Sequence, residues 1–267
     1  RIVTPSPDRV RAACPHYRAC GGCSLMHASD AFVEGWKADV VRAALQAQGI
    51  AAPFRPMVTS PDRSRRRATL AGRRTKSGAL VGFHGRASGT ITEIPDCRLL
   101  DPALVAALPV LARITAAGSS RKGGLDLTVT QCTNGLDVAV TGGKPLDAGL
   151  FAALAEAAGE AALTRLSWEG EPVVQREPPL QRFGGASVVL PPGAFLQATQ
   201  AGEAALLAAV TEATCGAARI VDLFAGCGTF ALPLAGVAEV HAVEGDKTMI
   251  AALLAGARKA PGLRRVT

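Results

Sequence analysis

Short runs of apolar residues, bounded by glycine, proline or asparagine, recur through the first 190 positions. Such runs are typical of strands. Thr133-Asn134-Gly135 lies between two of them and is a hairpin signal. The predicted strands cover residues 68–70, 80–84, 90–94, 125–130, 136–140, 164–168 and 186–190.

Three segments of this region have helical spacing instead. The first begins at a capping residue, Ser29 or Asp30, and stops at Gly49. Its apolar positions are Val33, Trp36, Val40, Ala44 and Leu45. Further helices are predicted at 101–117 and 147–158, and the prolines of 51–62 indicate a linker. The pattern predicts a mixed α+β unit.

The pattern changes after residue 190. A helix at about 198–214 precedes an apolar strand at 218–224, a glycine loop with a helix, a strand at 239–244 and a helix from Asp246. This βαβα order predicts the first part of a parallel, doubly wound sheet of the α/β class. Arg264–Thr267 resembles the approach to a third strand. We therefore expect the chain to stop short of a complete sheet.

Length and composition set broad limits. A chain of 267 residues with 48% apolar residues can bury a sizeable core, as one large domain or two smaller ones. No apolar run is long enough for a membrane span, and residues 1–5 lack the apolar core of a signal peptide, so we expect a cytoplasmic protein without a membrane partner. Seven cysteines, an odd number, favour thiols and metal ligation over a disulfide framework.

Three of those cysteines lie close together as Cys14-x5-Cys20-Gly-Gly-Cys23. Gly21 and Gly22 allow backbone angles that other residues resist, which helps three thiolates converge on one point. The spacing predicts a metal-binding corner that lacks a fourth ligand. Spacing alone favours zinc and an iron–sulfur cluster equally, and His16 or His27 could complete a zinc site.

The net charge of +7 is concentrated between residues 63 and 92, where eight cations occur without an acid and leave about −1 for the rest of the chain. This local basicity points to a surface for a polyanion such as nucleic acid, with a solvated charged face as the alternative. The cations are Arg63, Arg65, Arg66, Arg67, Arg73, Arg74, Lys76 and Arg86.

The glycine loop, Asp222-Leu-Phe224-Ala-Gly226-Cys-Gly228, follows the strand at 218–224, and Glu244 ends the next strand. Glycines let a ligand approach the backbone, and an acid at the position of Glu244 can accept both ribose hydroxyls of an adenosine. The spacing also fits a dinucleotide fingerprint. Asp222 would repel a pyrophosphate, so we favour S-adenosylmethionine over a dinucleotide or a purely structural turn.

In this order, the clustered cysteines, a lone Cys97, the segment Pro192–Gln197 and the glycine loop with Glu244 resemble the uracil-5 RNA methyltransferases, in particular their iron–sulfur branch, over nearly the whole chain. The resemblance implies a 4Fe-4S cluster and S-adenosyl-L-methionine as cofactors. It assigns the cluster to Cys14, Cys20, Cys23 and Cys97, and the methyl donor to Gln197, Phe224, Gly226, Gly228 and Glu244.

The chain also departs from the family. Only what resembles the trailing edge of the family's TRAM domain precedes the cysteines. The expected catalytic nucleophile and base lie beyond Thr267, since Cys132, Cys215 and Cys227 match no family motif. Thr229 stands where some members have asparagine. His16, His27 and His84 are expected to have packing or surface roles.

The resemblance implies three parts. These are a cysteine loop with the TRAM edge (1–30), a central mixed α+β RNA-binding domain (31–190) and an incomplete, Rossmann-like methyltransferase domain (191–267). A monomer that methylates C5 of an unstacked uridine is expected, with 23S rRNA favoured over tRNA. The alternatives are a metal-bearing RNA-binding module and a nucleotide-dependent iron–sulfur oxidoreductase.

Overall fold

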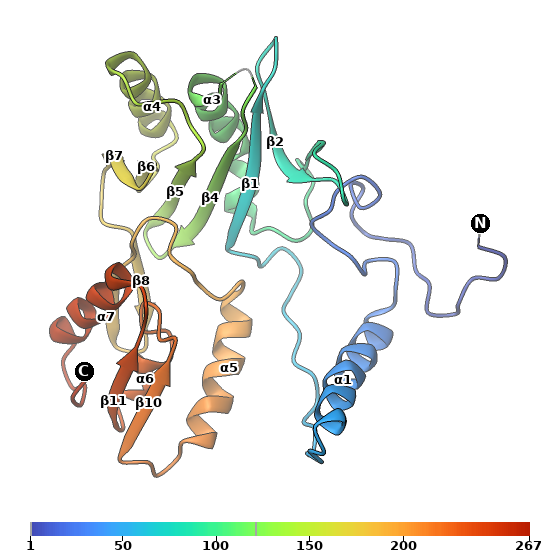
Figure 1. Ribbon diagram of the computed structural model, residues 1–267, viewed down its shortest axis with the longest axis vertical. Helices are drawn as coiled ribbons and strands as arrows, with labels where there is room; N and C mark the ends of the chain where they lie inside the picture. Colours follow the sequence, from blue (N-terminus) through green and yellow to red (C-terminus); the bar gives the residue numbers. More distant parts are fainter. Residues whose placement is uncertain (1, 121) are drawn as a thin grey trace.

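The fold is given by a computed structural model, which describes residues 2–120 and 122–267. Its largest element is a seven-stranded sheet with the order β3-β2-β1-β4-β5-β6-β7 (Figure 1). Neighbours are antiparallel except β5 and β6, which are parallel because α4 (Ala148–Glu160) carries the chain back between them. The strands are β1 (Arg67–Arg74), β2 (Ala79–His84), β3 (Ile91–Glu93), β4 (Leu125–Cys132), β5 (Gly135–Thr141), β6 (Arg165–Trp168) and β7 (Glu171–Gln175).

Helices cover one face of this sheet. Helix α3 (Leu108–Gly118) packs on β1 and β2 and against α4, while α2 (Pro102–Ala106) packs on β4. The opposite face is more polar, and there the hydroxyls of Thr69 and Thr128 lie 2.8 Å apart on neighbouring strands. The apolar side chains between sheet and helices are fully buried, among them Leu70, Ile114, Leu127, Val138 and Leu154. The central sheet therefore has a closed core of its own.

The prediction of one helix over 101–117 is wrong in one respect. Asp101 caps α2 by accepting a 2.8 Å hydrogen bond from the Ala103 N–H, and α3 begins only at Leu108. Pro109 lies in the first turn of α3. Proline has no N–H to continue the hydrogen bonds of a preceding helix, so the segment restarts as a second helix at this point.

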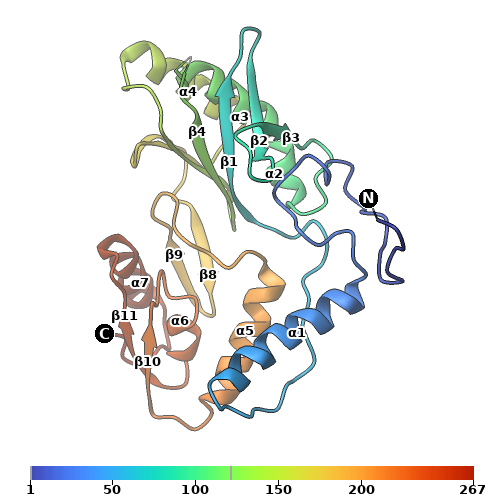
Figure 2. The same cartoon turned by 45° about the vertical axis from the view of Figure 1, so that its right-hand side comes forward.

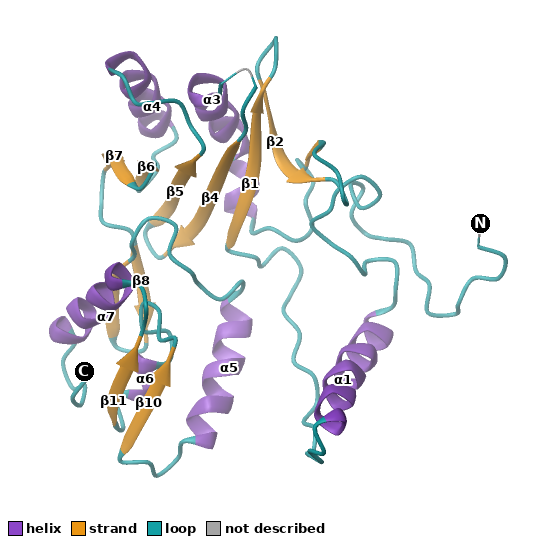
Figure 3. Cartoon of the chain, in the orientation of Figure 1, coloured by secondary structure: helices purple, strands orange, loops and turns teal. Residues whose placement is uncertain are grey.

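The second core contains the βαβα segment that the sequence predicts, with β10 and β11 parallel (Figure 3). Helix α7 packs on β9, and α6 packs on β11. Val266 pairs with Val240 of β11 in the parallel sense, as expected for the approach to a third strand. The elements are β8 (Leu180–Phe183), β9 (Ala186–Val189), α5 (Gln200–Ala213), β10 (Arg219–Leu223), α6 (Ala231–Leu234), β11 (Glu239–Val243) and α7 (Lys247–Lys259).

The β8–β9 hairpin belongs to this second core. Phe183 and Val188 are buried in one cluster with Leu232 and Leu253. The boundary between the two cores thus precedes β8, rather than falling at 190 as the sequence pattern suggested. Strands β7 and β8 were not predicted, because Pro172 and several charged or amide side chains interrupt their apolar alternation.

Helix α1 (Asp30–Ala47) begins where predicted, since the Ser29 hydroxyl accepts the Phe32 N–H at 3.3 Å. Its apolar side remains largely uncovered, with Trp36 46% and Val40 51% exposed. Figures 1 and 2 show α1 away from the central sheet, and one cleft has walls from both α1 and α5. Within residues 2–120 and 122–267, no helix has the length and apolarity needed to cross a membrane.

Candidate functional site

The loop between β10 and α6 uses its glycines for two different reasons. Gly226 and Gly228 both adopt left-handed backbone angles, with φ of 56° and 98°. A Cβ on Gly228 would lie 2.7 Å from the Leu232 side chain, so this residue lets α6 pack closely. A Cβ on Gly226 would meet nothing within 4 Å, which leaves open space next to the backbone. A ligand can approach the chain at Gly226.

Glu244 lies directly beside that open backbone. One carboxylate oxygen accepts the Gly226 N–H at 2.8 Å and the other accepts the Asp246 N–H at 2.9 Å. These hydrogen bonds hold the pKa of Glu244 below its ordinary value. The structure therefore brings Gly226 and Glu244 together, as the sequence predicts, with a fixed negative charge at the carboxyl edge of the parallel strands.

Phe224 has a backbone conformation that a folded chain tolerates only when its surroundings enforce it. Its φ is 62°, in the left-handed region, and its side chain is 90% exposed. An aromatic residue in this region is strained by about 1–3 kcal/mol, and such strain concentrates at ligand sites. The exposed ring stands at the end of β10, immediately before the glycine loop, where it can stack on a planar ligand.

Asp222 and Cys227 are the less accessible groups of this site. The Oδ2 atom of Asp222 is buried without a hydrogen-bond partner among the described residues, and burial raises the pKa of this carboxyl. An orphaned buried acceptor of this kind suits the ammonium group of a ligand. Burial, with the charges of Asp246 and Glu244, raises the pKa of the Cys227 thiol to about 12. Cys227 is therefore an inert packing group.

Two arginines of β1 and its approach hold the segment that carries Gln197. Arg67 donates from Nε to the Ala194 carbonyl at 3.0 Å and from its guanidinium to the Gly193 carbonyl at 3.1 Å. Arg66 donates from Nε to the Gln197 carbonyl at 3.2 Å and pairs with Glu203 at 2.5 Å. We call Arg66, Arg67 and Glu203 the arginine clamp. It joins the central sheet to the second core.

This clamp corrects the predicted RNA-binding strip. Arg66 is only 3% exposed, and Arg67 is half-buried against backbone carbonyls, so neither is free to contact RNA. The sequence did not predict this structural role, because Arg66 and Glu203 are 137 positions apart and no local motif marks the pair. Arg63, Arg73, Arg74, Lys76 and Arg86 are exposed and Arg65 is partly exposed, so these six remain predicted RNA contacts.

Gln197 lines a cleft to which the glycine loop does not contribute. It lines the cleft between α1 and α5, together with Arg65 and Thr199, and none of the residues 222–228 forms part of that cleft. Ala194 and Leu196, its neighbours, are buried in the second core with Ala225 and Cys227. The segment is therefore anchored near the loop, while the cofactor role of Gln197 stays a prediction.

The cysteine loop packs on the end of β2. Cys20 pairs with Gly85, and the Gly21 N–H donates to the His84 carbonyl at 2.8 Å. Neither Gly21 nor Gly22 has a left-handed φ, contrary to the expected reason for these glycines. A Cβ on Gly21 would lie 2.6 Å from the His84 carbonyl oxygen. Gly21 is thus required by close approach to the strand and not by its backbone angle.

Cys14, Cys20, Cys23 and Cys97 line one pocket, whose other walls include Phe83 and Ile94. Backbone N–H groups point to two of the sulfurs, from Gly22 to Cys20 at 3.3 Å and from Leu99 to Cys97 at 3.4 Å. Burial and the neighbouring thiolates raise the pKa values of Cys20 and Cys23. The distant Cys97 therefore lines the same pocket as the clustered three, as the family resemblance implies.

The described cysteine and histidine side chains of this region do not form a compact site for a single metal ion. Among the described residues, no three His, Cys, Asp or Glu side chains are close enough together to bind a metal ion directly. The histidines have other partners: His27 Nδ1 is 2.5 Å from the Tyr17 hydroxyl, and His16 Nε2 is 3.4 Å from the Asp96 N–H. Four thiols around one apolar pocket with N–H···S contacts nevertheless fit a thiolate-held group in donor type and number.

Comparison with known proteins gives a consistent class. No family model matches the chain. An uncharacterized RNA methyltransferase of Caulobacter vibrioides is 41% identical over 273 residues, with 100% of this chain and 66% of the relative covered. A second one, of Brucella suis, is 38% identical and covers 100% and 64%. The chain is thus homologous to proteins named RNA methyltransferases and spans slightly under two thirds of their length.

Two further similar proteins are named as uracil-C5 methyltransferases. The 23S rRNA (uracil(1939)-C(5))-methyltransferase RlmD of Halomonas elongata is 32% identical over 281 residues, with 97% of this chain and 58% of the relative covered. The crystal structure of Pyrococcus abyssi tRNA (uracil-54, C5)-methyltransferase with S-adenosyl-L-homocysteine has a TM-score of 0.73 at 18% identity, over 100% of this chain and 67% of that one. This likeness shows that the mixed α/β fold is shared.

Proposed function

We propose that the chain is the donor-binding and RNA-binding part of an S-adenosylmethionine-dependent methyltransferase that acts on uridine C5 in RNA. The homologous RNA methyltransferases support the reaction class, and the fold shared with a uracil-5 enzyme supports the base. In this proposal 23S rRNA is the first candidate substrate and tRNA the second.

The arrangement of Gly226, Glu244 and Phe224 carries the proposal. Glu244 presents a carboxylate for the ribose hydroxyls beside the open backbone at Gly226, and Phe224 offers an exposed ring for the adenine. The unpaired Asp222 oxygen suits the ammonium group of the methionine part. Glu244, Phe224 and Asp222 thus match the ribose, the adenine and the ammonium group of S-adenosylmethionine. They match a pyrophosphate less well.

The methyl transfer itself needs two more groups. C5 of uracil becomes nucleophilic when a thiolate adds to C6, and a base must then remove the C5 proton so that the thiolate can leave. Cys132 and Cys227 are buried, with pKa values raised to about 12, and Cys215 follows α5 on the surface. None of these three suits attack on a bound uracil. Our proposal therefore assigns nucleophile and base to residues outside this sequence.

A 4Fe-4S cluster on Cys14, Cys20, Cys23 and Cys97 is the metal group that we propose. The support for it is that four cysteines line one pocket and so supply the donor type and number that such a cluster requires. When bound, it would supply a crosslink between the cysteine loop and the segment after β3. Anaerobically purified protein should contain iron and sulfide, and a zinc content without sulfide would contradict this assignment.

The methyl-donor assignment is tested by calorimetry with S-adenosyl-L-homocysteine. Glu244→Gln should weaken binding by roughly 10- to 150-fold, because it removes a charged hydrogen-bond acceptor. Glu239→Gln is the matched control, since Glu239 is exposed at the start of β11. Equal affinities of wild type and both variants, or preferential binding of NAD, would contradict the proposal. Methyl transfer by the full-length enzyme to 23S rRNA or tRNA transcripts then identifies the substrate.

A further inference from the structure

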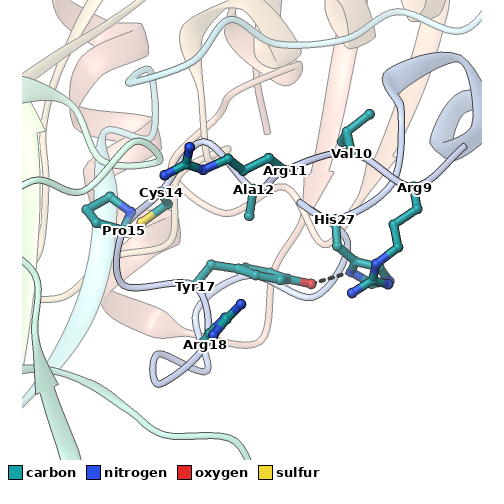
Figure 4. Close-up of a pocket in the computed structure, with 9 residues that line it drawn as sticks. All are labelled: Arg9, Val10, Arg11, Ala12, Cys14, Pro15, Tyr17, Arg18 and His27. Atoms are coloured by element: carbon teal, nitrogen blue, oxygen red, sulfur yellow. Dashed lines mark hydrogen bonds between the residues drawn. The ribbon is translucent and has the colours of Figure 1, made fainter. Parts of the chain in front are cut away.

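A second pocket lies in the N-terminal loops, next to the cysteine pocket, with which it shares Cys14 and Tyr17. It has a volume of about 590 Å³, within the range typical of small-ligand sites. Figure 4 shows the Tyr17 ring extending across it toward His27, with Arg9, Arg11 and Arg18 around it. The remaining walls are Val10, Ala12, Cys14 and Pro15. In both Figures 1 and 2 these N-terminal loops lie on the opposite side of the molecule from β10.

The charge of this pocket is entirely positive. Its walls include three arginines and no acid. Within the described part of the chain, none of these arginines forms an ion pair, whereas five other arginines do. The nearest acid in sequence, Asp8, accepts a hydrogen bond from the Ser29 hydroxyl at 3.2 Å. The three guanidinium groups are consequently available for an anion such as a phosphodiester.

Tyr17, the only tyrosine of the chain, is held in place for stacking. Its hydroxyl donates to the Ser24 carbonyl at 2.7 Å and lies 2.5 Å from His27 Nδ1. The Arg86 guanidinium lies 4.8 Å from the ring centroid and also donates to the Cys23 carbonyl at 2.7 Å. Arg86 does not line the pocket, whereas Tyr17 does. A fixed ring loses little freedom when a base stacks on it.

We infer that this pocket binds one unpaired nucleotide of the RNA substrate, away from the uridine that is methylated. The base stacks on Tyr17, and the flanking phosphates lie between Arg11 and Arg18. An aromatic platform beside cations that follow the backbone is the general arrangement for single-stranded nucleic acid. The inference rests on the proposed RNA methyltransferase function and adds a second contact point, which would orient a long RNA across the molecule.

The test measures binding of a fluorescent single-stranded oligoribonucleotide to metal-loaded, full-length protein. Arg11→Gln with Arg18→Gln should weaken binding and reduce the slope of log K against log salt by about 1.4, because two phosphate contacts are lost. Tyr17→Leu should weaken binding roughly 5- to 150-fold through lost stacking, while Tyr17→Phe keeps the ring and should bind as the wild type does. The matched control is Arg176→Gln with Arg182→Gln, two exposed residues of which Arg176 precedes β8 and Arg182 lies within it.

Photo-crosslinking with 4-thiouridine RNA gives an independent readout, and the crosslink should map to the peptide that contains Tyr17. The inference fails if both arginine pairs have equal effects and the crosslinks map elsewhere. Displacement of the RNA by equimolar uridine monophosphate would indicate a free-nucleotide site and overturn it as well. Binding of S-adenosyl-L-homocysteine and methyl transfer by the wild type are measured separately. If the wild type transfers methyl groups and the variants bind RNA as the wild type does, the RNA-binding role of the pocket is refuted. The proposed methyltransferase function is then unaffected.

Discussion

The central sheet and the parallel pair β10–β11 use similar apolar strands with different results. In the central sheet, Leu70 and Leu127 are fully buried under α2, α3 and α4. In β10, Val221 is 62% and Leu223 is 63% exposed, although their sequence is at least as apolar. Helices α6 and α7 and the β8–β9 hairpin supply the packing partners of the second core.

The two regions differ both in strand direction and in how far the described residues cover their apolar side chains. An antiparallel sheet can leave one polar face in water, as the face with Thr69 and Thr128 does. A parallel pair of apolar strands needs cover on both faces. The central sheet completes its core with its own helices, whereas Val221 and Leu223 of β10 have little cover from the residues that the structure describes. The candidate cofactor site lies in the less covered region.

The largest expected contrast concerns one leucine from each region. Leu127→Ala should lower the free energy of unfolding by about 2–5 kcal/mol, because it leaves a cavity in a closed core. Leu223→Ala should change it by less than about 0.5 kcal/mol, because the side chain is already exposed. Urea denaturation followed by circular dichroism measures both.

Leu232→Ala serves as the control for that experiment. Leu232 is fully buried in the second core. A lower free energy of unfolding for Leu232→Ala would show that the measurement detects unfolding of that core. If Leu223→Ala lowers the free energy of unfolding as much as Leu232→Ala does, β10 is covered in solution. The contrast between the central sheet and β10 would then no longer hold.

The arginine clamp connects the two regions, and its removal should have the next largest effect. Arg66→Met or Glu203→Gln should each cost about 1.5–3 kcal/mol, because each leaves a partly buried charged partner without its hydrogen bond. The double variant should cost less than the sum of the two, and a double-mutant cycle gives the coupling. Arg63→Met, at an exposed position nearby, is the control. Strict additivity would show that the pair does not couple the two cores.

Phe224 should affect ligand binding and not stability. Because the ring is 90% exposed, Phe224→Ala should leave the unfolding free energy within about 0.5 kcal/mol. Loss of stacking should weaken S-adenosyl-L-homocysteine about 2- to 12-fold in calorimetry. The exposed Phe195 provides the matched control, since Phe195→Ala removes an aromatic ring that lies under Arg67. Unchanged affinity for the Phe224 variant would remove this residue from the site.

The smallest effect is a difference in thiol labelling that leaves the fold unchanged. At pH 8, Cys132 and Cys227 should resist iodoacetamide, because burial raises both pKa values to about 12 and keeps the groups as neutral thiols. Raising the pH toward 12 should increase their labelling in the folded protein. Cys215 is exposed and should react at pH 8. Peptide mapping by mass spectrometry separates the three, and rapid labelling of Cys227 at pH 8 would show that the loop opens.

Local patterns predicted most elements of both regions. Ser29 and Asp246 cap the helices that follow them, and Thr133-Asn134-Gly135 forms the hairpin between β4 and β5. These features depend on a few neighbouring residues and are therefore readable in the sequence. The strands β7 and β8 were not predicted because they lack apolar alternation. Pairing with neighbouring strands and packing hold them in place.

The candidate site also contains some features that the sequence predicted and others that depend on contacts between distant segments. The association of Gly226 with Glu244 was predictable from the glycine-loop pattern, whereas that of Cys97 with the cysteine loop followed only from the resemblance to a known family. The roles of Arg66 and Arg67 were not, because charge in the sequence does not show whether a side chain meets water or a carboxylate 137 positions away. Burial decided that question, and it changed two predicted RNA contacts into a structural clamp.

By itself, the sequence determined the order of most elements, the close spacing of three cysteines and the acid that accompanies the glycine loop. These follow from side-chain chemistry and from periodicity along a few turns or strands. Only the tertiary structure decided that β8 and β9 belong to the second core, that Gly21 is required by contact with His84, and that Arg9, Arg11 and Arg18 surround Tyr17. Such features depend on which distant segments meet, and the packing of the whole chain sets those meetings.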